Sequence, residues 1–305
     1  MKYLVSLCIP TNGVLEWCIP VIDSIYCQGV DEELFQVVVT DNGDNEAFRL
    51  KMEEYSGSHQ NFRYEKTDAV GFLNQIQSFR LADGKLIKFI NHRMCLLPGS
   101  LKEFINYAEK NSEADVVYFS NGALRKRNTI TVGSFDAFMD QLSYWSSWSA
   151  GLALWNSDKN ELDNIQHFNS LFPHTDVLFM RKHAESYKIV DIPLLKELPV
   201  DDTKKGHYNL FYAFGNEYLK LIKNLENEGD ISVGTYSHIY GDLKKFLGTM
   251  YGVYILGKKP CSYDLTNADA IIQENFSLDE IKKIAQKSLR RVRFQNFVKR
   301  ILGRK

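Results

Sequence analysis

The sequence lacks the features that mark disulfide-stapled, zinc-binding and membrane-spanning proteins. Its five cysteines are odd in number and form no Cys-x-x-Cys pair, which argues against a disulfide framework or a zinc site. No stretch reaches about 18 uncharged apolar residues, the length needed to cross a bilayer. The chain passes from Met1 directly into an apolar segment, without a basic-then-apolar leader. These absences predict a protein of the reducing cytoplasm.

The composition is that of a globular protein with a basic tail. The 305 residues suffice for one large α/β domain or two modest ones, and 44% hydrophobic residues can build a full core. No internal repeat or low-complexity tract is present. Ten Lys or Arg and no Asp or Glu lie between Ile281 and Lys305. Because the formal net charge is −1, the rest of the chain carries −11, so an acidic body precedes a basic tail.

Short apolar runs alternate with helical patterns through the first 120 residues. This alternation predicts right-handed βαβ units and a mainly parallel central sheet flanked by helices. Residues 1–120, 121–205 and 206–305 are expected to form a ligand-binding half, a second half and a helical C-terminal extension. The expected strands are Tyr3–Ile9, Phe35–Thr40, Phe62–Lys66, Leu86–Ile90, Asp115–Phe119, Ala150–Trp155 and Tyr187–Ile192. The expected helices lie near Val14–Tyr26, Glu46–Tyr55, Gly71–Leu81, Gly99–Glu109, Ser170–His183, Leu210–Asn227, Thr235–Ile255 and Leu278–Leu289.

Polar clusters end the first two expected strands. The first run stops at Pro10-Thr11-Asn12 and the second at Asp41-Asn42-Gly43. The carboxyl ends of parallel strands are where α/β sheets bind ligands. A carboxylate there can accept a hydrogen bond from the imide N–H of uracil or thymine. Ordinary turn chemistry, which many doubly wound folds show, is the alternative explanation.

These strand ends are followed by Gly71-Phe72-Leu73-Asn74 and by Leu97-Pro98-Gly99-Ser100-Leu101. Together they resemble the nucleotide-sugar-binding half of family 2 glycosyltransferases with the GT-A fold, over about residues 1–110. The resemblance implies a UDP- or dTDP-sugar donor and a helix start near Asn74 that borders its diphosphate. It also implies that the nucleoside is held by Pro10, Thr11, Asn12 and Asp41.

The family's metal-binding Asp-x-Asp is missing from this chain. The register set by Leu97–Leu101 places Asn91 and Arg93 at the acidic positions, with His92 between them. In the favoured hypothesis, Arg93 and His92 bind the diphosphate in place of a metal. In a second, Mg²⁺ or Mn²⁺ binds through phosphate oxygens, Asn91 and an acid from elsewhere. In a third, the site is catalytically silent.

Inverting sugar transfer also requires a general base for the acceptor hydroxyl. The segment Phe172–Arg181 resembles the family's helix start that carries this base, which makes Asp176 the candidate. His174 is the alternative, because its ordinary pKa of about 6.5 suits a base. Simple capping of the helix would also explain Asp176. The Pro-His pair here is similar to abequosyltransferase-like members of the family, which implies O-antigen or capsule synthesis.

Three further residues are candidates for substrate contact. Trp148 and Gly151 would line an acceptor sugar, since aromatic faces stack on sugar rings and small residues allow close approach; core packing is the alternative. His207 matches a Gly-rich segment that relatives carry after the catalytic helix, where it would close over the phosphates. A solvated loop histidine is the other explanation.

The basic tail changes its apolar face near Arg291–Arg293, so we expect the helix to break there. The last residues would then bind an anionic membrane surface. A merely solvated terminus is the alternative. Nucleic-acid binding is the other partner that such charge suggests, but no recognition motif accompanies it. The sequence therefore predicts a glycosyltransferase on the inner face of the cell membrane, acting on a glycan or polyprenyl-diphosphate-linked acceptor. A silent nucleotide-sugar-binding or scaffold subunit and a nucleotidyltransferase are the alternatives, although Thr11–Glu16 lacks the latter's Gly-rich basic loop.

Overall fold

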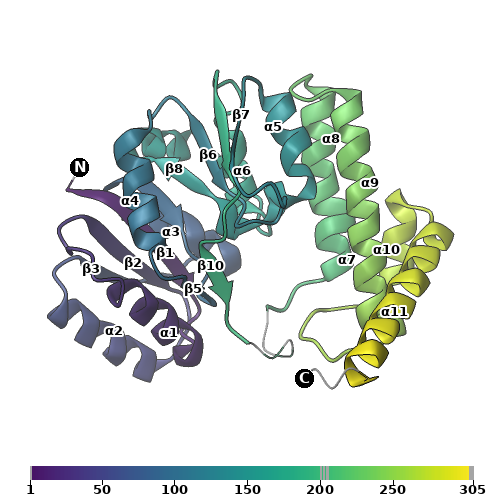
Figure 1. Ribbon diagram of the computed structural model, residues 1–305, viewed down its shortest axis with the longest axis horizontal. Helices are drawn as coiled ribbons and strands as arrows, with labels where there is room; N and C mark the ends of the chain where they lie inside the picture. Colours follow the sequence, from purple (N-terminus) through teal and green to yellow (C-terminus); the bar gives the residue numbers. More distant parts are fainter. Residues whose placement is uncertain (1, 200, 202, 204–205, 302–305) are drawn as a thin grey trace. The chain divides into compact units, whose positions relative to one another are not determined.

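The computed structural model describes residues 2–199, 201, 203 and 206–301, and beyond residue 290 it describes the backbone alone. The chain divides into two compact units, Met1–Leu198 and Pro199–Lys305 (Figure 1). The first unit is built around β-sheets, and the second is helical. The expected α/β fold with a parallel central sheet and a helical C-terminal extension is confirmed.

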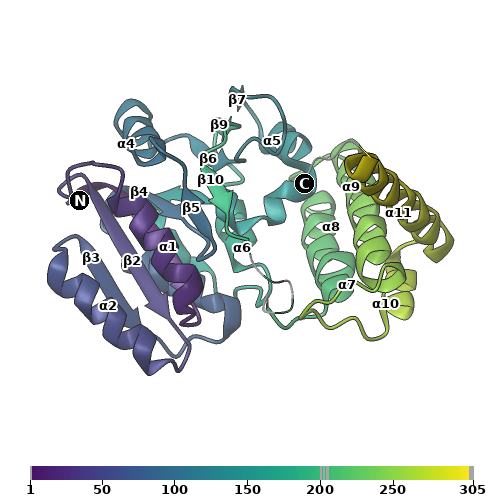
Figure 2. The ribbon, with the colours of Figure 1, turned by 60° about the horizontal axis from the view of Figure 1, so that its bottom comes forward.

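The central sheet has five strands in the order β3-β2-β1-β4-β8 (Figures 1 and 2). Its first four strands pair in parallel and β8 pairs antiparallel to β4. Apart from Leu4, the Val, Ile and Leu side chains along β1 and β2 are fully buried, as in a sheet covered on both faces. The strands are β1 (Tyr3–Thr11), β2 (Phe35–Asp41), β3 (Phe62–Lys66), β4 (Gly84–Phe89) and β8 (Ala153–Trp155). The connecting helices are α1 (Leu15–Tyr26), α2 (Glu46–Ser58), α3 (Asn74–Arg80) and α4 (Ser100–Lys110).

A second sheet continues the first at the level of β8. It contains β6 (Val116–Phe119), β9 (Tyr187–Val190) and β7 (Thr129–Val132), in the order β6-β9-β7. A single antiparallel bridge joins Tyr118 to Leu152, just before β8. Since β8 is also antiparallel to β4, strands β4 and β6 run in the same direction. The carboxyl ends of β1, β2, β4 and β6 therefore face one edge, here called the ligand edge.

Several elements differ from the sequence-based expectation. The third expected helix begins with a 3₁₀ turn, Gly71–Leu73, before α3. The helix expected over Ser170–His183 is only α6 (Pro173–Phe179), because Pro173 occupies its first turn. The short strands β5 (Met94–Leu96) and β10 (Leu195–Glu197) form an antiparallel pair that was not expected. Helix α5 (Phe135–Leu142) was also missed.

The second unit consists of helices packed on one another. Its last helix, α11 (Leu278–Ile301), is continuous, so the expected break near Arg291–Arg293 is wrong for the backbone. A change of apolar face does not interrupt the backbone hydrogen bonds of the helix, because Arg, Lys and Gln are good helix formers. The membrane-binding side chains expected beyond this point lie outside the described residues. The other helices are α7 (Leu210–Tyr212), α8 (Leu219–Asn227), α9 (Val233–Met250) and α10 (Ala268–Asn275), with π-helical turns at Ala213–Tyr218 and Tyr251–Leu256.

Close contact joins α11 to α9 and to the π-helical turn that follows it, Tyr251–Leu256. A Cβ atom added to Gly248 would lie 2.6 Å from Ile284 Cγ2, and one added to Gly252 would lie 2.8 Å from the carbonyl oxygen of Ala285. Glycine is therefore required at both places.

In the described part of the chain, no helix combines the length and apolarity needed to span a bilayer.

Candidate functional site

The ends of β1 and β2 form the first part of the candidate site. Thr11 pairs with Asp41 in the register of these parallel strands. The Asp41 carboxylate accepts hydrogen bonds from the Gly43 N–H (2.8 Å) and from the Tyr64 hydroxyl (3.2 Å). Burial raises the pKa of Asp41, and these donors oppose the rise. Because Asp41 is only 1% exposed, a nucleobase can reach it only if the adjoining turns shift.

Asn74 fastens these two strand ends together. Its side-chain amide donates to the carbonyl oxygens of Thr11 (3.0 Å) and Thr40 (2.8 Å), and its Oδ1 accepts from the Thr67 hydroxyl (2.9 Å). The side chain is buried, so every one of these groups needs a partner. The structure thus gives Asn74 a positioning task at the ligand edge, with its amide already bonded inside the protein.

The Thr11 hydroxyl connects the first strand to the turn after β4. It accepts from the Gly13 N–H (3.2 Å) and the Cys18 thiol (3.1 Å), and it lies 2.8 Å from His92 Nδ1. With both lone pairs occupied, the hydroxyl donates its own proton to Nδ1, which leaves the His92 proton on Nε2. Burial lowers the pKa of His92 to about 3, and the Arg93 charge acts in the same direction. His92 is therefore a neutral N–H donor.

Arg93 carries a buried donor with no partner. The Asn91 Oδ1 accepts from the Arg93 backbone N–H (3.1 Å) and faces its Nε (3.5 Å), which orients the guanidinium. The guanidinium carbon lies 5.5 Å from the centre of the Trp17 ring. Arg93 Nη1 is buried without a hydrogen-bond partner in the described structure. An unpaired buried cationic donor is costly, and an anionic ligand would satisfy it.

A divalent cation does not fit this turn. Mg²⁺ and Mn²⁺ are bound mainly by carboxylate oxygens, and none of residues 91–93 has one. The only side-chain oxygen in the turn, Asn91 Oδ1, is directed at the N–H groups of Arg93. Among the residues that the structure describes, no group of three or more His, Cys, Asp or Glu could hold a metal ion.

Helix α6 presents the two acid–base candidates. Asp176 Oδ2 accepts a hydrogen bond from the Asn169 N–H (2.5 Å), and Asn169 Oδ1 in turn accepts from the Leu171 and Phe172 N–H groups (2.9 Å each). Burial raises the pKa of Asp176 to about 6, in spite of the hydrogen bond from Asn169. A carboxylate with this pKa is ionised at neutral pH and can still take up a proton.

His174 is held in one tautomer. Its Nε2 lies 2.8 Å from the Ser147 carbonyl oxygen and must donate to it, which leaves a lone pair on Nδ1. Nδ1 is buried and has no partner among the described residues. Burial lowers the pKa of His174 to about 4, so the imidazole is neutral and a weaker base than the neighbouring carboxylate.

The aromatic segment Tyr144–Leu152 is pinned through its carbonyl oxygens. Lys88 Nζ, fully buried, donates to those of Ala150 (2.5 Å) and Leu152 (3.1 Å). The single hydroxyl proton of Tyr118 is shared between those of Trp145 and Trp148. The Trp148 ring is half-buried and makes an edge contact with Trp145 (6.0 Å between centroids). Buried donors from β4, β6 and α6 therefore fix the segment that carries this ring.

Gly151 and His207 have local explanations. A Cβ atom at Gly151 would lie 2.0 Å from Cζ of Tyr118, so ring packing alone requires the glycine. His207 is exposed and belongs to the second unit. Sequence reasoning missed Lys88, although a lysine inside the apolar run Leu86–Ile90 is a signal for a buried cation with a specific partner.

No model of a known protein family matches the chain, and no curated protein matches it in sequence. The fold is similar to that of S. aureus TarS. The crystal structure of TarS 1-349 in complex with UDP-GlcNAc aligns with a TM-score of 0.57 at 14% identity, covering 100% of this chain and 93% of that one. Its complex with UDP aligns with a TM-score of 0.54 at 16% identity, covering 84% and 75%. These likenesses establish the shared fold.

A mannosyltransferase from Pyrobaculum calidifontis, in complex with GDP-Man and Mn²⁺, aligns less well. Its TM-score is 0.47 at 12% identity, covering 95% of this chain and 88% of that one. This score is too low to bear on the present chain.

Proposed function

We propose that this protein is a glycosyltransferase that moves a sugar from a nucleoside diphosphate donor to a hydroxyl group of a glycan. The observation that carries the proposal is the buried, unpartnered Nη1 of Arg93 at the ligand edge. A guanidinium with an open donor suits a diphosphate, which offers several acceptor oxygens and negative charge. The fold shared with a protein solved with UDP-GlcNAc supports the same donor class.

The donor would lie across the ends of β1, β2 and β4. Asp41 would accept the imide N–H of a uracil or thymine ring, with Pro10 and Asn12 beside the nucleoside. Arg93 would bind the diphosphate, and the His92 Nε2–H would be a second donor. In this arrangement the fixed charge of Arg93 stabilises the leaving diphosphate without a metal ion.

The transfer would proceed by a single displacement. The acceptor hydroxyl gives its proton to the Asp176 carboxylate as its oxygen forms a bond to sugar C1. The bond between C1 and the donor phosphate oxygen breaks, and its electron pair leaves with the diphosphate. Attack from the face opposite the leaving group inverts C1.

The acceptor would lie against the pinned aromatic segment, with the half-buried Trp148 ring as a stacking surface. We infer a polyprenyl-diphosphate-linked glycan of bacterial O-antigen or capsule synthesis as the acceptor, at the inner face of the membrane.

Calorimetry with UDP, dTDP, GDP and CDP tests the donor class. The proposal expects binding of at least one pyrimidine nucleoside diphosphate, and Asp41→Asn should weaken the preference for that base. Mass spectrometry of products from a donor library with lipid-extract acceptors then tests transfer. Absence of binding to any nucleotide would contradict the proposal. Binding without transfer in every donor and acceptor combination would favour a silent nucleotide-sugar-binding subunit.

A further inference from the structure

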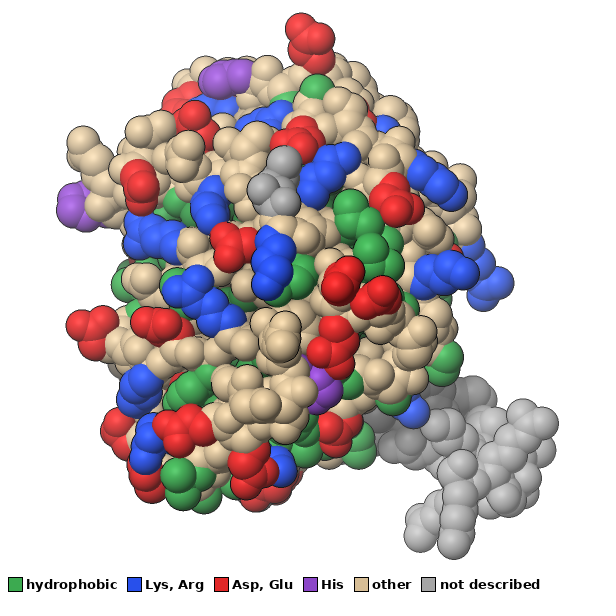
Figure 3. Space-filling view, turned by 90° about the vertical axis from the view of Figure 1, so that its left-hand side faces the viewer, with side chains coloured by type: hydrophobic (Ala, Val, Ile, Leu, Met, Phe, Trp, Pro, Cys, Tyr) green, Lys and Arg blue, Asp and Glu red, His purple; other side chains and the backbone are tan. Residues whose placement is uncertain are grey.

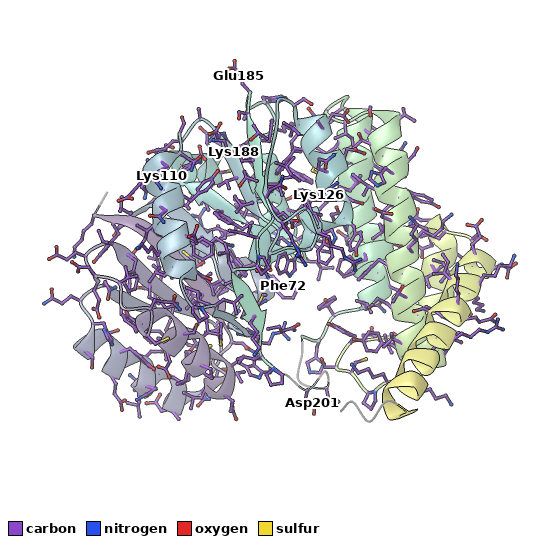
Figure 4. The ribbon with its side chains drawn as sticks, in the orientation of Figure 1. Phe72, Lys110, Lys126, Glu185, Lys188 and Asp201 are labelled. Atoms are coloured by element: carbon purple, nitrogen blue, oxygen red, sulfur yellow. The ribbon has the colours of Figure 1, made fainter. Side chains whose placement is uncertain are left out.

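The loop that follows β6 presents three adjacent cations. Arg125, Lys126 and Arg127 are exposed, and their side chains make no ion pair within the described structure (Lys126 is labelled in Figure 4). We call residues 121–128 the basic loop. Because β6 runs in the same direction as β4, the loop begins at the ligand edge.

The backbone of the basic loop is strained. Asn121, Arg125 and Arg127 have φ values of 55°, 60° and 57°. Glycine and asparagine tolerate this left-handed conformation, whereas arginine adopts it at a steric cost. Two arginines at such positions indicate that their charged side chains serve a purpose that glycine would not.

A buried carboxylate holds this conformation. Asp191 is 0% exposed; its Oδ1 accepts from the Ser120 hydroxyl (2.6 Å) and the Leu124 N–H (3.1 Å). Its Oδ2 accepts from the backbone N–H groups of Lys126 (2.6 Å) and Arg127 (3.2 Å). The N–H groups of the loop therefore already bind an internal anion, as in a backbone nest. The three exposed cationic side chains are left for an external one.

The base of the loop is joined to the strand pair that carries Arg93. Asn121 Oδ1 accepts from the N–H groups of Leu194 (2.7 Å) and Leu195 (2.8 Å). Leu195 begins β10, which pairs with β5, and β5 starts directly after Arg93. The Leu198 N–H donates to the Arg93 carbonyl oxygen (2.8 Å). The basic loop and the proposed diphosphate site are thus parts of one bonded framework.

We propose that the basic loop binds a phosphate group of the acceptor. This inference rests on the proposed function. In the strand order, β8 separates β6 from β4, which puts the loop about 10 Å to the acceptor side of the donor turn at ordinary strand spacing. Three cations on a rigid loop suit phosphate and not a neutral sugar. The face shown in Figure 3 differs, because charges of both signs are mixed across it.

The chemistry admits two sources of phosphate, a lipid diphosphate or phosphodiesters within a glycan polymer. The test measures binding of farnesyl-diphosphate-linked N-acetylglucosamine, of the same farnesyl glycoside without the diphosphate, and of a glycerol phosphate oligomer. The variant Arg125→Asn/Lys126→Gln/Arg127→Asn removes the charge, while asparagine tolerates the strained backbone. The control Lys102→Gln/Lys110→Gln/Lys220→Gln removes the same charge at other exposed positions.

The intact protein is expected to bind one of the two phosphate-bearing probes, and a lipid source would show as preference over the farnesyl glycoside. The loop variant should lose about tenfold in affinity for that probe, and the control should not. Unchanged affinity in the loop variant, or no binding of either probe to the intact protein, would overturn the inference. The inference would also be overturned if the loop variant lost as much affinity for phosphatidylglycerol vesicles as for the probe, because the loop would then be a membrane contact. UDP binding is measured alongside. If the intact protein does not bind UDP, the result contradicts the proposed function and not the phosphate contact. If only the loop variant fails to bind UDP, the basic loop binds the donor and not the acceptor.

Discussion

His174 and Asp176 stand two residues apart at the start of α6, and burial reverses their usual order of basicity. The pKa of the imidazole falls to about 4 and that of the carboxyl group rises to about 6. The imidazole is also tied to the Ser147 carbonyl oxygen, so its orientation is set by the aromatic segment. The carboxylate is therefore the better acceptor for a proton at neutral pH.

Asp176→Asn should strongly reduce turnover while making the fold more stable. We expect activity to fall by about 10²-fold or more, because the amide cannot take the acceptor proton. The raised pKa means that the folded state holds its proton more tightly, so its contribution to stability is present at low pH and is lost as the pH rises through about 6. Urea unfolding at about pH 8 should therefore show a gain of up to about 2 kcal/mol in the variant. Full turnover in the variant would exclude Asp176 as the base.

His174→Ala should weaken acceptor binding without moving the pH profile. The substitution removes the hydrogen bond to Ser147 and should cost about 1–3 kcal/mol of stability. The acidic limb of kcat/KM should keep an apparent pKa of about 6, set by Asp176. His174→Gln, which retains a side-chain N–H donor, should recover part of the loss. A displaced acidic limb in either variant would assign the base to His174 instead.

Lys88→Met should be strongly destabilising. The fully buried ammonium bonds three carbonyl oxygens, those of Phe89, Ala150 and Leu152. Leaving them unpaired should cost about 2–4 kcal/mol, read from denaturant unfolding. The matched control is Lys85→Met on the same strand, whose ammonium is only partly buried and bonds the Ala108 carbonyl. Equal effects of the two substitutions would show that the pinned segment does not depend on Lys88.

Gly151→Ala tests whether core packing or sugar approach requires the glycine. The added methyl group would overlap the Tyr118 ring, so we expect about 2 kcal/mol of destabilisation. If the ring is the cause, Tyr118→Leu in the same chain should make the glycine substitution much less costly in a double-mutant cycle. If the two substitutions instead destabilise the protein additively, and Gly151→Ala weakens acceptor binding in protein that is still folded, the result would support a sugar-lining role.

Much of the first unit was predictable because its signals are local. The runs ending at Thr11 and Asp41 became β1 and β2, and their register brings these residues side by side. The β5–β10 pair was not predictable, because two three-residue strands about a hundred residues apart leave no periodic signal. Helix α11 is continuous although its apolar residues change from one face to another. Such a change affects how a helix can pack, but it does not prevent the helix from forming.

Side-chain tasks at the site were harder to foresee than strand ends. Asn74 and the Thr11 hydroxyl were expected to face the donor, yet both are bonded within the protein because buried polar groups need partners. A motif indicates which residue types gather at an edge. It does not show which of their atoms remain open, and at this edge the open atom found is Arg93 Nη1.

The affinity for UDP in the presence of EDTA tests the central claim most directly. The matched variants are Arg93→Ala and Arg80→Ala, the second removing an exposed arginine that pairs with Asp163. We expect EDTA to leave the affinity of the intact protein unchanged, Arg93→Ala to lower it by about tenfold or more, and Arg80→Ala to have no effect. Binding that EDTA abolishes, or that survives Arg93→Ala undiminished, would contradict the account.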